Sequence, residues 1–286
     1  MINLWYNENI KSGLVRGPRK VLENLHDSLE EQNIPFAVNE DKYKYNFLVH
    51  YDALGYAKHE KLEHDSCIIG PQIWPFDEYG QFLKNNPQYY RKIIVPGDSV
   101  YLSFKQQGFN ESKLAKWPVG IKDINVERSG NIKFLVYFKR RSIEDLDSVL
   151  SFLNEKECDY LVLKYGSYSQ EEFNQALQEC SHGIIVDGPE TQGIAIQEIM
   201  SSNMPILIWD NLEYFEDGVP EEYTKNPVPT SAHYFSAECG EKVYSEDEFK
   251  ETFDKFMKTQ YTPKEYVKRE LSYEITIKKL FALFEE

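Results

Sequence analysis

Residues 183–208 have the sequence GIIVDGPETQGIAIQEIMSSNMPILI. The apolar run at its start and the run after Pro205 carry hydrophobic side chains at successive positions, which is typical of strands buried on both faces. Between them lie a short loop with glycine and proline and a helical stretch from Gln192 to Ser202. The segment therefore predicts a strand, a loop, a helix and a second strand, the repeating unit of a doubly wound parallel sheet.

The same alternation extends along the whole chain. Strand candidates cover residues 2–6, 47–50, 67–69, 93–95, 133–138, 160–164, 183–186 and 205–209, and helical patterns cover residues 19–32, 144–154, 170–180, 192–202 and 263–286. A break falls near residues 117–121 and the polar stretch 127–131. We therefore predict an α/β protein with two Rossmann-like domains, residues 1–125 and 126–262, facing across a cleft. Residues 263–286 should form one helix that returns to the first domain, because its apolar positions need a surface to cover them.

The formal net charge is −15, and residues 1–125 contribute only −1 of it, with 15 Lys and Arg against 16 Asp and Glu. The remaining residues therefore carry −14. An acidic chain is a poor partner for nucleic acid or an anionic membrane, because both are negative. Hydrophobic residues make up 41% of the chain and aromatic residues 14%, enough apolar material for packed cores and too much for disorder. An anionic ligand must therefore be bound by a local basic cluster.

Cysteine usage and the hydrophobic pattern bear on location. The four cysteines form no CxxC pair, and their spacing fits neither a zinc site nor a disulfide scaffold, so we expect free thiols. The sequence starts on a strand-like run without the apolar stretch of a signal peptide, and no window approaches the about 18 to 20 apolar residues of a membrane span. We expect a cytoplasmic protein without a transmembrane segment; peripheral membrane contact stays open.

The loop and helix of residues 187–202 carry the polar residues that point to chemistry. Gly193 stands where the loop turns into the helix, where free backbone N–H groups and the helix dipole favour an anion such as a diphosphate. The Glu190 carboxylate in the loop can reach hydroxyl groups of a ligand. Glu198 lies about 7.5 Å beyond Gly193, at roughly 1.5 Å per helical residue. Two carboxylates staggered in this way can bind two separate polyol units, a hexose and a ribose.

These residues resemble the EX7E motif of retaining GT-B glycosyltransferases, the glycosyltransferase group 1 enzymes. The matching features are Glu190, Gly193 three residues later, Glu198 after seven intervening residues, and Pro205 leading into an aliphatic strand. The family usually has an aromatic residue before the glycine, where this chain has Gln192. The resemblance implies a nucleotide diphosphate sugar as donor, bound by Thr191, Gln192 and Gly193. It also implies that Glu190 holds sugar hydroxyls and Glu198 the ribose.

A basic cluster follows the predicted strand of residues 133–138. Lys139, Arg140 and Arg141 stand at its carboxyl end, where guanidinium and ammonium groups can neutralise a diphosphate leaving group. In similar enzymes this strand ends in a basic residue, which Lys139 matches, and a lysine follows a few residues on. Acidic residues occupy that second position here, so Arg140 or Arg141 would take its role. The alternative is a solvated basic turn.

Three further residues are assigned through the resemblance. Gly13 lies in a loop similar to the glycine-containing loop after the first strand of GT-B enzymes, although a plain turn fits as well. His50 ends a strand, as does a histidine that faces the donor sugar in similar enzymes; a structural role is the alternative. Tyr165 follows the strand of residues 160–164, where a base-binding loop would fall. We find no metal-ligand spacing and no DxD-type motif at a strand end, and expect neither a metal nor a resident cofactor.

The sequence therefore predicts transfer of a sugar from a UDP- or GDP-sugar to a hydroxyl of a glycan or another acceptor, with retention at the anomeric carbon. The predicted catalytic residues are Glu190, Lys139 and His50. The alternative from another class is a non-catalytic GT-B-fold protein that binds sugar or nucleotide, or serves as a subunit of an assembly. A nucleotide-sugar epimerase of similar fold is less favoured, because its active-site carboxylates and histidine are not evident.

Overall fold

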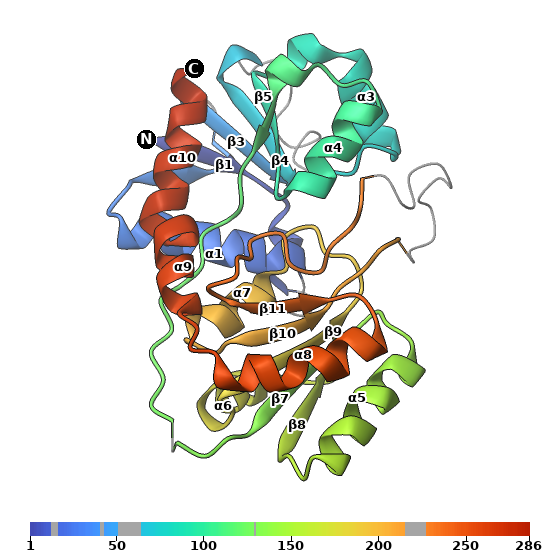
Figure 1. The fold of residues 1–286 in the computed structure, drawn as a ribbon. Coiled ribbons are helices and arrows are strands. Elements are labelled where there is room, and N and C mark those ends of the chain that lie inside the picture. The colour runs from blue at the N-terminus through green and yellow to red at the C-terminus, as the bar shows by residue number, and fades with distance from the viewer. Residues whose placement is uncertain (13–16, 41–42, 51–63, 129, 215–226) are drawn as a thin grey trace. The chain divides into compact units, whose positions relative to one another are not determined.

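The computed structural model describes residues 1–12, 17–40, 43–50, 64–128, 130–214 and 227–286. The chain forms two compact units (Figure 1). Unit 1 contains residues 1–120 and 271–286, and unit 2 contains residues 121–270. The two units divide between residues 120 and 121, five residues before the boundary at 125/126 that the sequence suggested. In the part of the chain that the structure describes, no helix is long and apolar enough to cross a membrane.

Unit 1 is built on a parallel sheet of six strands in the order β2-β1-β3-β4-β5-β6. The strands are β1 Ile2–Trp5, β2 Phe36–Val38, β3 Tyr45–His50, β4 Cys67–Gln72, β5 Lys92–Val95 and β6 Leu114–Lys116. The α-helices described in this unit are α1 Gly17–Glu31, α3 Glu78–Asn85, α4 Asp98–Gln106 and α10 Tyr273–Glu285, and short 3₁₀ turns cover Glu8–Ser12, His64–Ser66, Pro87–Tyr89 and Glu111–Lys113. The strand residues of β1 and β5 are almost all buried, as expected for strands covered on both faces.

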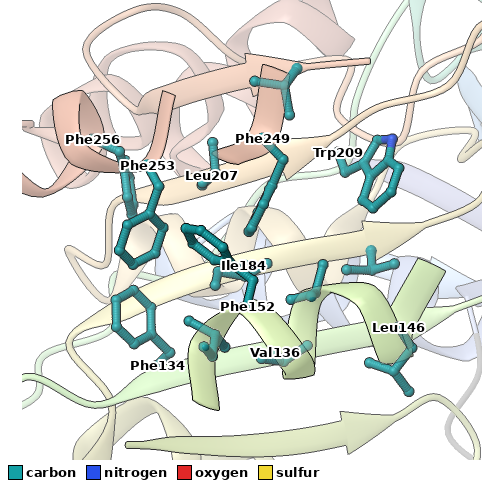
Figure 2. Close-up of a cluster of buried hydrophobic side chains, with 14 residues drawn as sticks. Phe134, Val136, Leu146, Phe152, Ile184, Leu207, Trp209, Phe249, Phe253 and Phe256 are labelled. Atoms are coloured by element: carbon teal, nitrogen blue, oxygen red, sulfur yellow. The ribbon is translucent and has the colours of Figure 1, made fainter. Parts of the chain in front are cut away.

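Unit 2 contains a parallel sheet of five strands in the order β11-β10-β9-β7-β8. The strands are β7 Phe134–Lys139, β8 Tyr160–Lys164, β9 His182–Asp187, β10 Ile206–Trp209 and β11 Gly240–Val243. The α-helices described here are α5 Ile143–Glu155, α6 Gln170–Glu179, α7 Ile194–Ser201, α8 Glu246–Lys258 and α9 Pro263–Leu271. One face of the sheet packs against α5 and α8, with Phe249 and Phe253 at the centre of the core (Figure 2).

Serine side chains set the starts of helices α5 and α6. Ser142 accepts a hydrogen bond from the backbone N–H of Asp145 at 3.1 Å and caps α5. Ser169 and Glu172 form a capping box at the start of α6, each side chain bonding the other's backbone N–H. Such caps satisfy N–H groups that the first helical turn leaves without partners. They place the strand-to-helix turns of β7 and β8 at defined positions.

The C-terminal segment forms two helices, α9 and α10, where the sequence pattern suggested a single helix. Ser272 interrupts it, because its side chain accepts from the backbone N–H of Ile275 at 3.4 Å and starts a new helix. Residues 263–270 belong to unit 2 and α10 to unit 1. In unit 1 the Trp117 indole N–H donates to the carbonyl oxygen of Thr276 at 2.8 Å, which fixes α10 beside the chain that follows β6.

Candidate functional site in unit 2

The loop between β9 and α7 enters the helix through Gly193. This residue is the N-cap of α7 and has φ 78° and ψ 48°, in the left-handed region that favours glycine. A Cβ at this position would lie 2.8 Å from the carbonyl oxygen of Ser231, so a side chain has no space. The predicted sequence of strand, loop, helix and strand is present, with Gly193 at the turn into the helix.

Glu190, in this loop, forms ion pairs with the first two residues of the basic cluster. Lys139, the last residue of β7, contacts Glu190 Oε1 through its Nζ, and each of these side chains is only 13% exposed. Arg140 Nη2 lies 3.2 Å from the same oxygen. The adjacent strands β7 and β9 pair with Lys139 opposite Asp187, and this register brings the two segments together. The sheet thus places a carboxylate and two cations at one edge.

Tyr165 joins this group from the neighbouring strand. Its backbone N–H donates to the carbonyl oxygen of Phe138 at 2.9 Å, which holds the start of the loop after β8 against the end of β7. Lys139 Nζ lies 4.4 Å from the centroid of the Tyr165 ring. A cation over an aromatic face is attracted by the ring. The carboxyl ends of β7, β8 and β9 therefore all contribute to the site.

Asp187 is a buried carboxyl group at the base of the site. It is fully buried at the end of β9, and neither of its oxygens has a hydrogen-bond partner among the described residues. Burial raises the pKa of Asp187 well above its ordinary value, and the nearby charge of Glu190 raises it further. Lys139 and Arg140 lower this pKa but do not outweigh burial. The neutral, protonated form of Asp187 is therefore favoured.

Arg141 points to a different strand end from Lys139 and Arg140. Its side chain is 8% exposed and its Nε lies 2.8 Å from Asp145 Oδ2. Its Nη1 donates to Asn211 Oδ1 at 3.0 Å, and its guanidinium carbon lies 5.3 Å from the Trp209 ring centroid. The residue before it, Arg140, has φ 51°, a left-handed conformation in which the chain turns sharply. The predicted contact of Arg141 with a donor phosphate stays a prediction.

The remaining motif residues lie along the loop and α7. Gln192 is buried, and its Nε2 donates to Gln197 Oε1 at 3.0 Å while Gln197 Nε2 donates to the Gln192 carbonyl oxygen at 2.8 Å. This amide pair ties the loop to the first turns of the helix. Thr191 is exposed, and Glu198 is 8% exposed on α7.

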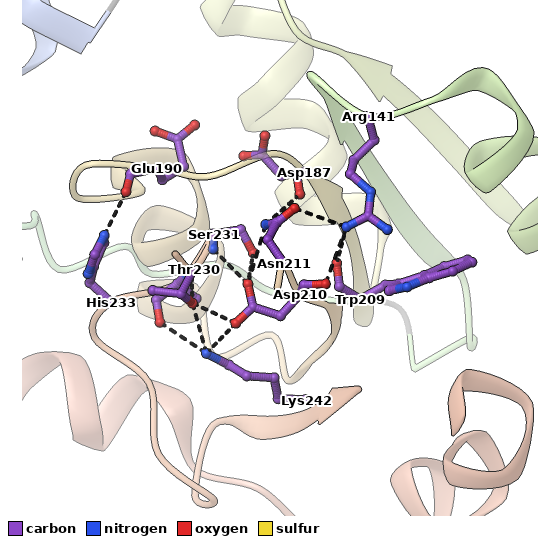
Figure 3. Close-up of polar contacts among 11 residues, drawn as sticks. Arg141, Asp187, Glu190, Trp209, Asp210, Asn211, Thr230, Ser231, His233 and Lys242 are labelled. Carbon is purple, nitrogen blue, oxygen red and sulfur yellow. Dashed lines mark hydrogen bonds and ion pairs between the residues drawn. The ribbon is translucent and has the colours of Figure 1, made fainter. Parts of the chain in front are cut away.

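A second polar cluster lies at the end of β10 (Figure 3). The Asp210 carboxylate accepts from the backbone N–H of Ser231 at 2.7 Å and from Thr230 Oγ1 at 2.6 Å. Lys242 Nζ lies 2.7 Å from Asp210 Oδ2. His233 Nε2 donates to the carbonyl oxygen of Glu190 at 2.6 Å, since a carbonyl can only accept. The cluster therefore connects directly to the loop that carries Glu190.

Comparison with solved structures shows the fold of this chain. Neither family models nor curated proteins match this sequence. Among solved structures, the apo form of the lipopolysaccharide outer core galactosyltransferase WaaB matches with a TM-score of 0.61 at 11% identity, over 99% of this chain and 98% of that one. Anabaena Alr3699/HepE in complex with UDP-glucose matches with a TM-score of 0.60 at 10% identity, over 99% of each chain. WaaG, a glycosyltransferase involved in lipopolysaccharide biosynthesis, matches with a TM-score of 0.51 at 8% identity, over 99% of each chain.

This chain has the GT-B fold. The prediction of two Rossmann-like α/β domains is thereby confirmed. In this GT-B chain the site described above lies wholly in unit 2. His50 ends β3 in unit 1 and is half-buried, and Gly13 lies outside the described residues. Among the residues that the structure describes, no group of three or more His, Cys, Asp or Glu side chains could hold a metal ion.

Tyr168, Asp187 and Asp210 were missed by sequence reasoning. Tyr168 is half-buried and its hydroxyl donates to the Tyr137 hydroxyl at 3.4 Å. Burial raises the pKa of Tyr168, its bond with Tyr137 opposes this, and the charge of Glu198 adds to the rise. The two aspartates did leave a signal, because each directly follows a run of apolar strand residues. At the carboxyl end of a parallel strand such residues are candidates for a site.

Proposed function

We propose that this GT-B chain is a retaining glycosyltransferase that moves a hexose from a nucleotide diphosphate sugar to a hydroxyl group. The observation that carries the proposal is the ion-pair group of Glu190 with Lys139 and Arg140 at the carboxyl ends of β7 and β9. Ligands of doubly wound sheets bind at this edge. Because HepE was solved with UDP-glucose, uridine donors are the first to test, followed by guanosine donors.

The two cations suit a diphosphate. Lys139 is only 13% exposed, so its charge is screened less by water than that of a surface lysine. Arg140 adds a guanidinium, whose planar fork matches phosphate oxygens. Both contact the Glu190 carboxylate. A diphosphate would compete for these cations and release the Glu190 carboxylate toward the sugar hydroxyls.

The helix that follows supplies the nucleotide side of the site. The backbone N–H groups at the start of α7, after Gly193, can bind an anion. Glu198 lies further along the same helix and is nearly buried, so a hydrogen bond from a ribose hydroxyl would be shielded from water. Tyr165 lies beside Lys139, and we assign it and the loop after β8 to the base.

In the proposed reaction the bond between the anomeric carbon and the diphosphate oxygen breaks, and a bond from the anomeric carbon to the acceptor oxygen forms. The acceptor proton passes to an oxygen of the departing diphosphate. Attack on the face that the diphosphate leaves retains the anomeric configuration and needs no protein nucleophile. Lys139 and Arg140 would stabilise the charge that develops on the leaving group. The proposal assigns this neutralisation to side chains, without a metal ion.

Nucleotide binding is the first test. The chain would be titrated calorimetrically with UDP, GDP and ADP, and its thermal unfolding followed with each, since a ligand of the native state raises stability by mass action. We expect one diphosphate to bind and Lys139→Ala to weaken it. The matched control is Lys164→Ala, which removes an exposed lysine at the end of β8. Absence of binding by every nucleotide would overturn the proposal.

Transfer is the second test. The chain would be incubated with UDP- and GDP-sugars and hydroxyl acceptors, with and without EDTA, and the product anomer identified by NMR. We expect EDTA-resistant transfer with retention. Inversion would contradict the retaining assignment, and loss of rate with EDTA would contradict the assignment of charge neutralisation to side chains. Nucleotide binding without transfer or hydrolysis would favour the non-catalytic binding protein.

A further inference from the structure

The buried carboxylate of Asp210 holds a segment of chain that is remote in sequence. Asp210 stands directly after β10, and its side chain is 1% exposed. It accepts hydrogen bonds from Thr230 Oγ1 at 2.6 Å, from the backbone N–H of Ser231 at 2.7 Å and from Ser231 Oγ at 3.1 Å. Lys242 in β11 lies 2.7 Å from Asp210 Oδ2, the oxygen that accepts from Thr230, and donates to Thr230 Oγ1 at 2.9 Å. Both carboxylate oxygens are therefore in use, and residues 230–231 are fixed to the ends of two strands.

Asp210 remains ionised at neutral pH. Burial raises its pKa, but the charge of Lys242 and the hydrogen bonds from Lys242, Thr230 and Ser231 outweigh burial, so the pKa lies below its ordinary value. A buried charge of this kind is stabilised only while its partners remain in place. Loss of either charge would therefore loosen the segment that the cluster holds.

Residues 230–233, which include this segment, bind the backbone of Glu190 through Thr230 and His233. The Glu190 N–H donates to the carbonyl oxygen of Thr230 at 3.0 Å, and His233 Nε2 donates to the Glu190 carbonyl oxygen at 2.6 Å. The carbonyl oxygen of Ser231 also fills the space that a side chain at Gly193 would need. Residues 230–233 therefore fix both polar groups of the Glu190 backbone and pack on the turn into α7. Figure 3 shows this path from Lys242 through Asp210 to the loop.

We propose that Asp210 and Lys242 are positioning residues for Glu190. Through residues 230–233 they fix the backbone of Glu190 and so aim its carboxylate at the donor sugar. The inference rests on the proposed function, because it assigns the Glu190 carboxylate to the sugar hydroxyls. Asp210 touches no donor atom in this scheme, and it acts only through Glu190. Loss of the cluster should weaken recognition of the sugar and leave recognition of the nucleotide, which depends on Lys139 and Glu198.

The test compares the affinities for UDP and UDP-glucose in a double-mutant cycle. The variants are Asp210→Asn, Glu190→Gln and the combination of the two, and the readout is the ratio of the two dissociation constants measured by calorimetry, together with kcat and KM. We expect Asp210→Asn to reduce the preference for UDP-glucose and to lower kcat by at least about 10-fold, since a misplacement of about 1 Å in an active site can cost up to about 100-fold. In the Glu190→Gln background, Asp210→Asn should have little further effect, because residues that act through one another are not additive.

Further variants distinguish the positioning of Glu190 from a general loss of folding stability. Lys242→Arg keeps the charge and should retain the sugar preference, whereas Lys242→Met should lose it; both remain informative if Asp210→Asn does not fold. Val149→Ala removes core volume under α5, lowers stability without touching residues 230–233, and should leave the ratio unchanged. Additive effects in the cycle, or the same ratio change in Val149→Ala, would overturn the positioning role. A wild-type chain that binds none of these nucleotides would instead overturn the proposed function.

Discussion

The two sheets are built alike but bury different kinds of polar group. In the described strands of unit 1 the buried polar side chains are the amides of Asn3 and Asn46: Asn3 Nδ2 and the Trp5 indole N–H both donate to Asn46 Oδ1, at 3.3 and 3.0 Å. Two strands of unit 2 instead lead to buried carboxyls, Asp187 as the last residue of β9 and Asp210 directly after β10. Neutral groups that satisfy one another hold neighbouring strands in register. Buried carboxyls are costly, and clusters of them in a site are typical of function rather than of stability.

The difference assigns separate tasks to the two units. Unit 1 ends its central strands with His50, Gln72 and Val95, whereas unit 2 gathers Lys139, Asp187 and the Asp210–Lys242 pair at one edge. Substitutions at the charged edge of unit 2 should therefore change ligand binding and turnover. Substitutions in the amide network of unit 1 should change stability alone.

The largest expected effect is on turnover. Lys139→Ala should lower kcat by about 100- to 1000-fold, as removal of one preorganised donor does at sites where charge develops. Arg141→Ala should cost less, because its guanidinium is engaged by Asp145, Asn211 and the end of β10. Steady-state kinetics with the donor found by titration would compare them, with thermal unfolding of each variant as the folding control. Equal and small losses would favour a solvated basic turn.

The second effect separates the two glutamates of the motif. Glu198→Ala should weaken UDP binding by about 10- to 100-fold, which corresponds to about 1.5 to 3 kcal/mol for a hydrogen bond to a charged group. Glu190→Ala should mainly lower turnover, because its carboxylate is assigned to the sugar. Calorimetric titration with UDP measures the first effect and transfer rates measure the second. Unchanged UDP affinity in Glu198→Ala would contradict the ribose assignment.

The third effect lies in unit 1 and involves no ligand. Asn46→Ala leaves the Trp5 indole N–H without its acceptor inside the sheet, and we expect a loss of about 1 to 3 kcal/mol in the free energy of unfolding. Hydrogen exchange of β1 and β3 amides would measure this, and UDP affinity should stay unchanged. Gln88→Ala, which removes an exposed amide hydrogen bond, is the matched control. A changed UDP affinity in Asn46→Ala would break the division of tasks between the units.

The apolar strands and the motif helix could be predicted from the sequence because they are local patterns. All eight predicted strands are present, and their ends agree within two residues except at residues 67–69, where β4 continues to Gln72. The strands β2, β6 and β11 were missed because they are short and carry polar or intermediate positions, as in Gly240–Val243. Helices α3, α4 and α8 lie in stretches that were left unassigned, although α8 has a clear apolar face of Phe249, Phe253 and Phe256.

The same holds for the candidate site: residues in contiguous sequence patterns could be predicted, and contacts between segments far apart in the sequence could not. Glu190, Gly193 and Lys139 could be found because the motif and the strand end are contiguous in sequence, and the strand register brings them together. The contact between Asp210 and Thr230 could not, because it joins the end of β10 to a segment twenty residues further along the chain. The break at Ser272 was also missed, because the apolar positions continue through it and only the capping serine marks it.

The last and smallest effect compares Asp187 with Asp210. They lie at the ends of the adjacent strands β9 and β10, yet their pKa values move in opposite directions from the ordinary value of 3.8. Asp187 has no hydrogen-bond partner among the described residues and lies beside Glu190, so burial dominates and its pKa rises. Asp210 has Lys242 and several donors, which outweigh its burial. Stability should consequently respond to pH with opposite signs at the two positions.

For Asp187 the folded state holds a proton above pH 3.8 that the unfolded state has lost, so the free energy of unfolding falls as pH rises from 3.8 toward the raised pKa. Asp187→Asn removes this titration, so the stability of the variant relative to the wild type should increase as pH rises through that window.

For Asp210 the stabilisation is present above pH 3.8 and lost as pH falls toward the lowered pKa. Asp210→Asn should therefore be destabilised at neutral pH and approach the wild type below pH 3.8. Hydrogen exchange of β9 and β10 amides between pH 3 and 8 would follow both differences. The same sign for both variants would mean that Asp187 is ionised and paired like Asp210, and that the contrast between these two strand ends is wrong.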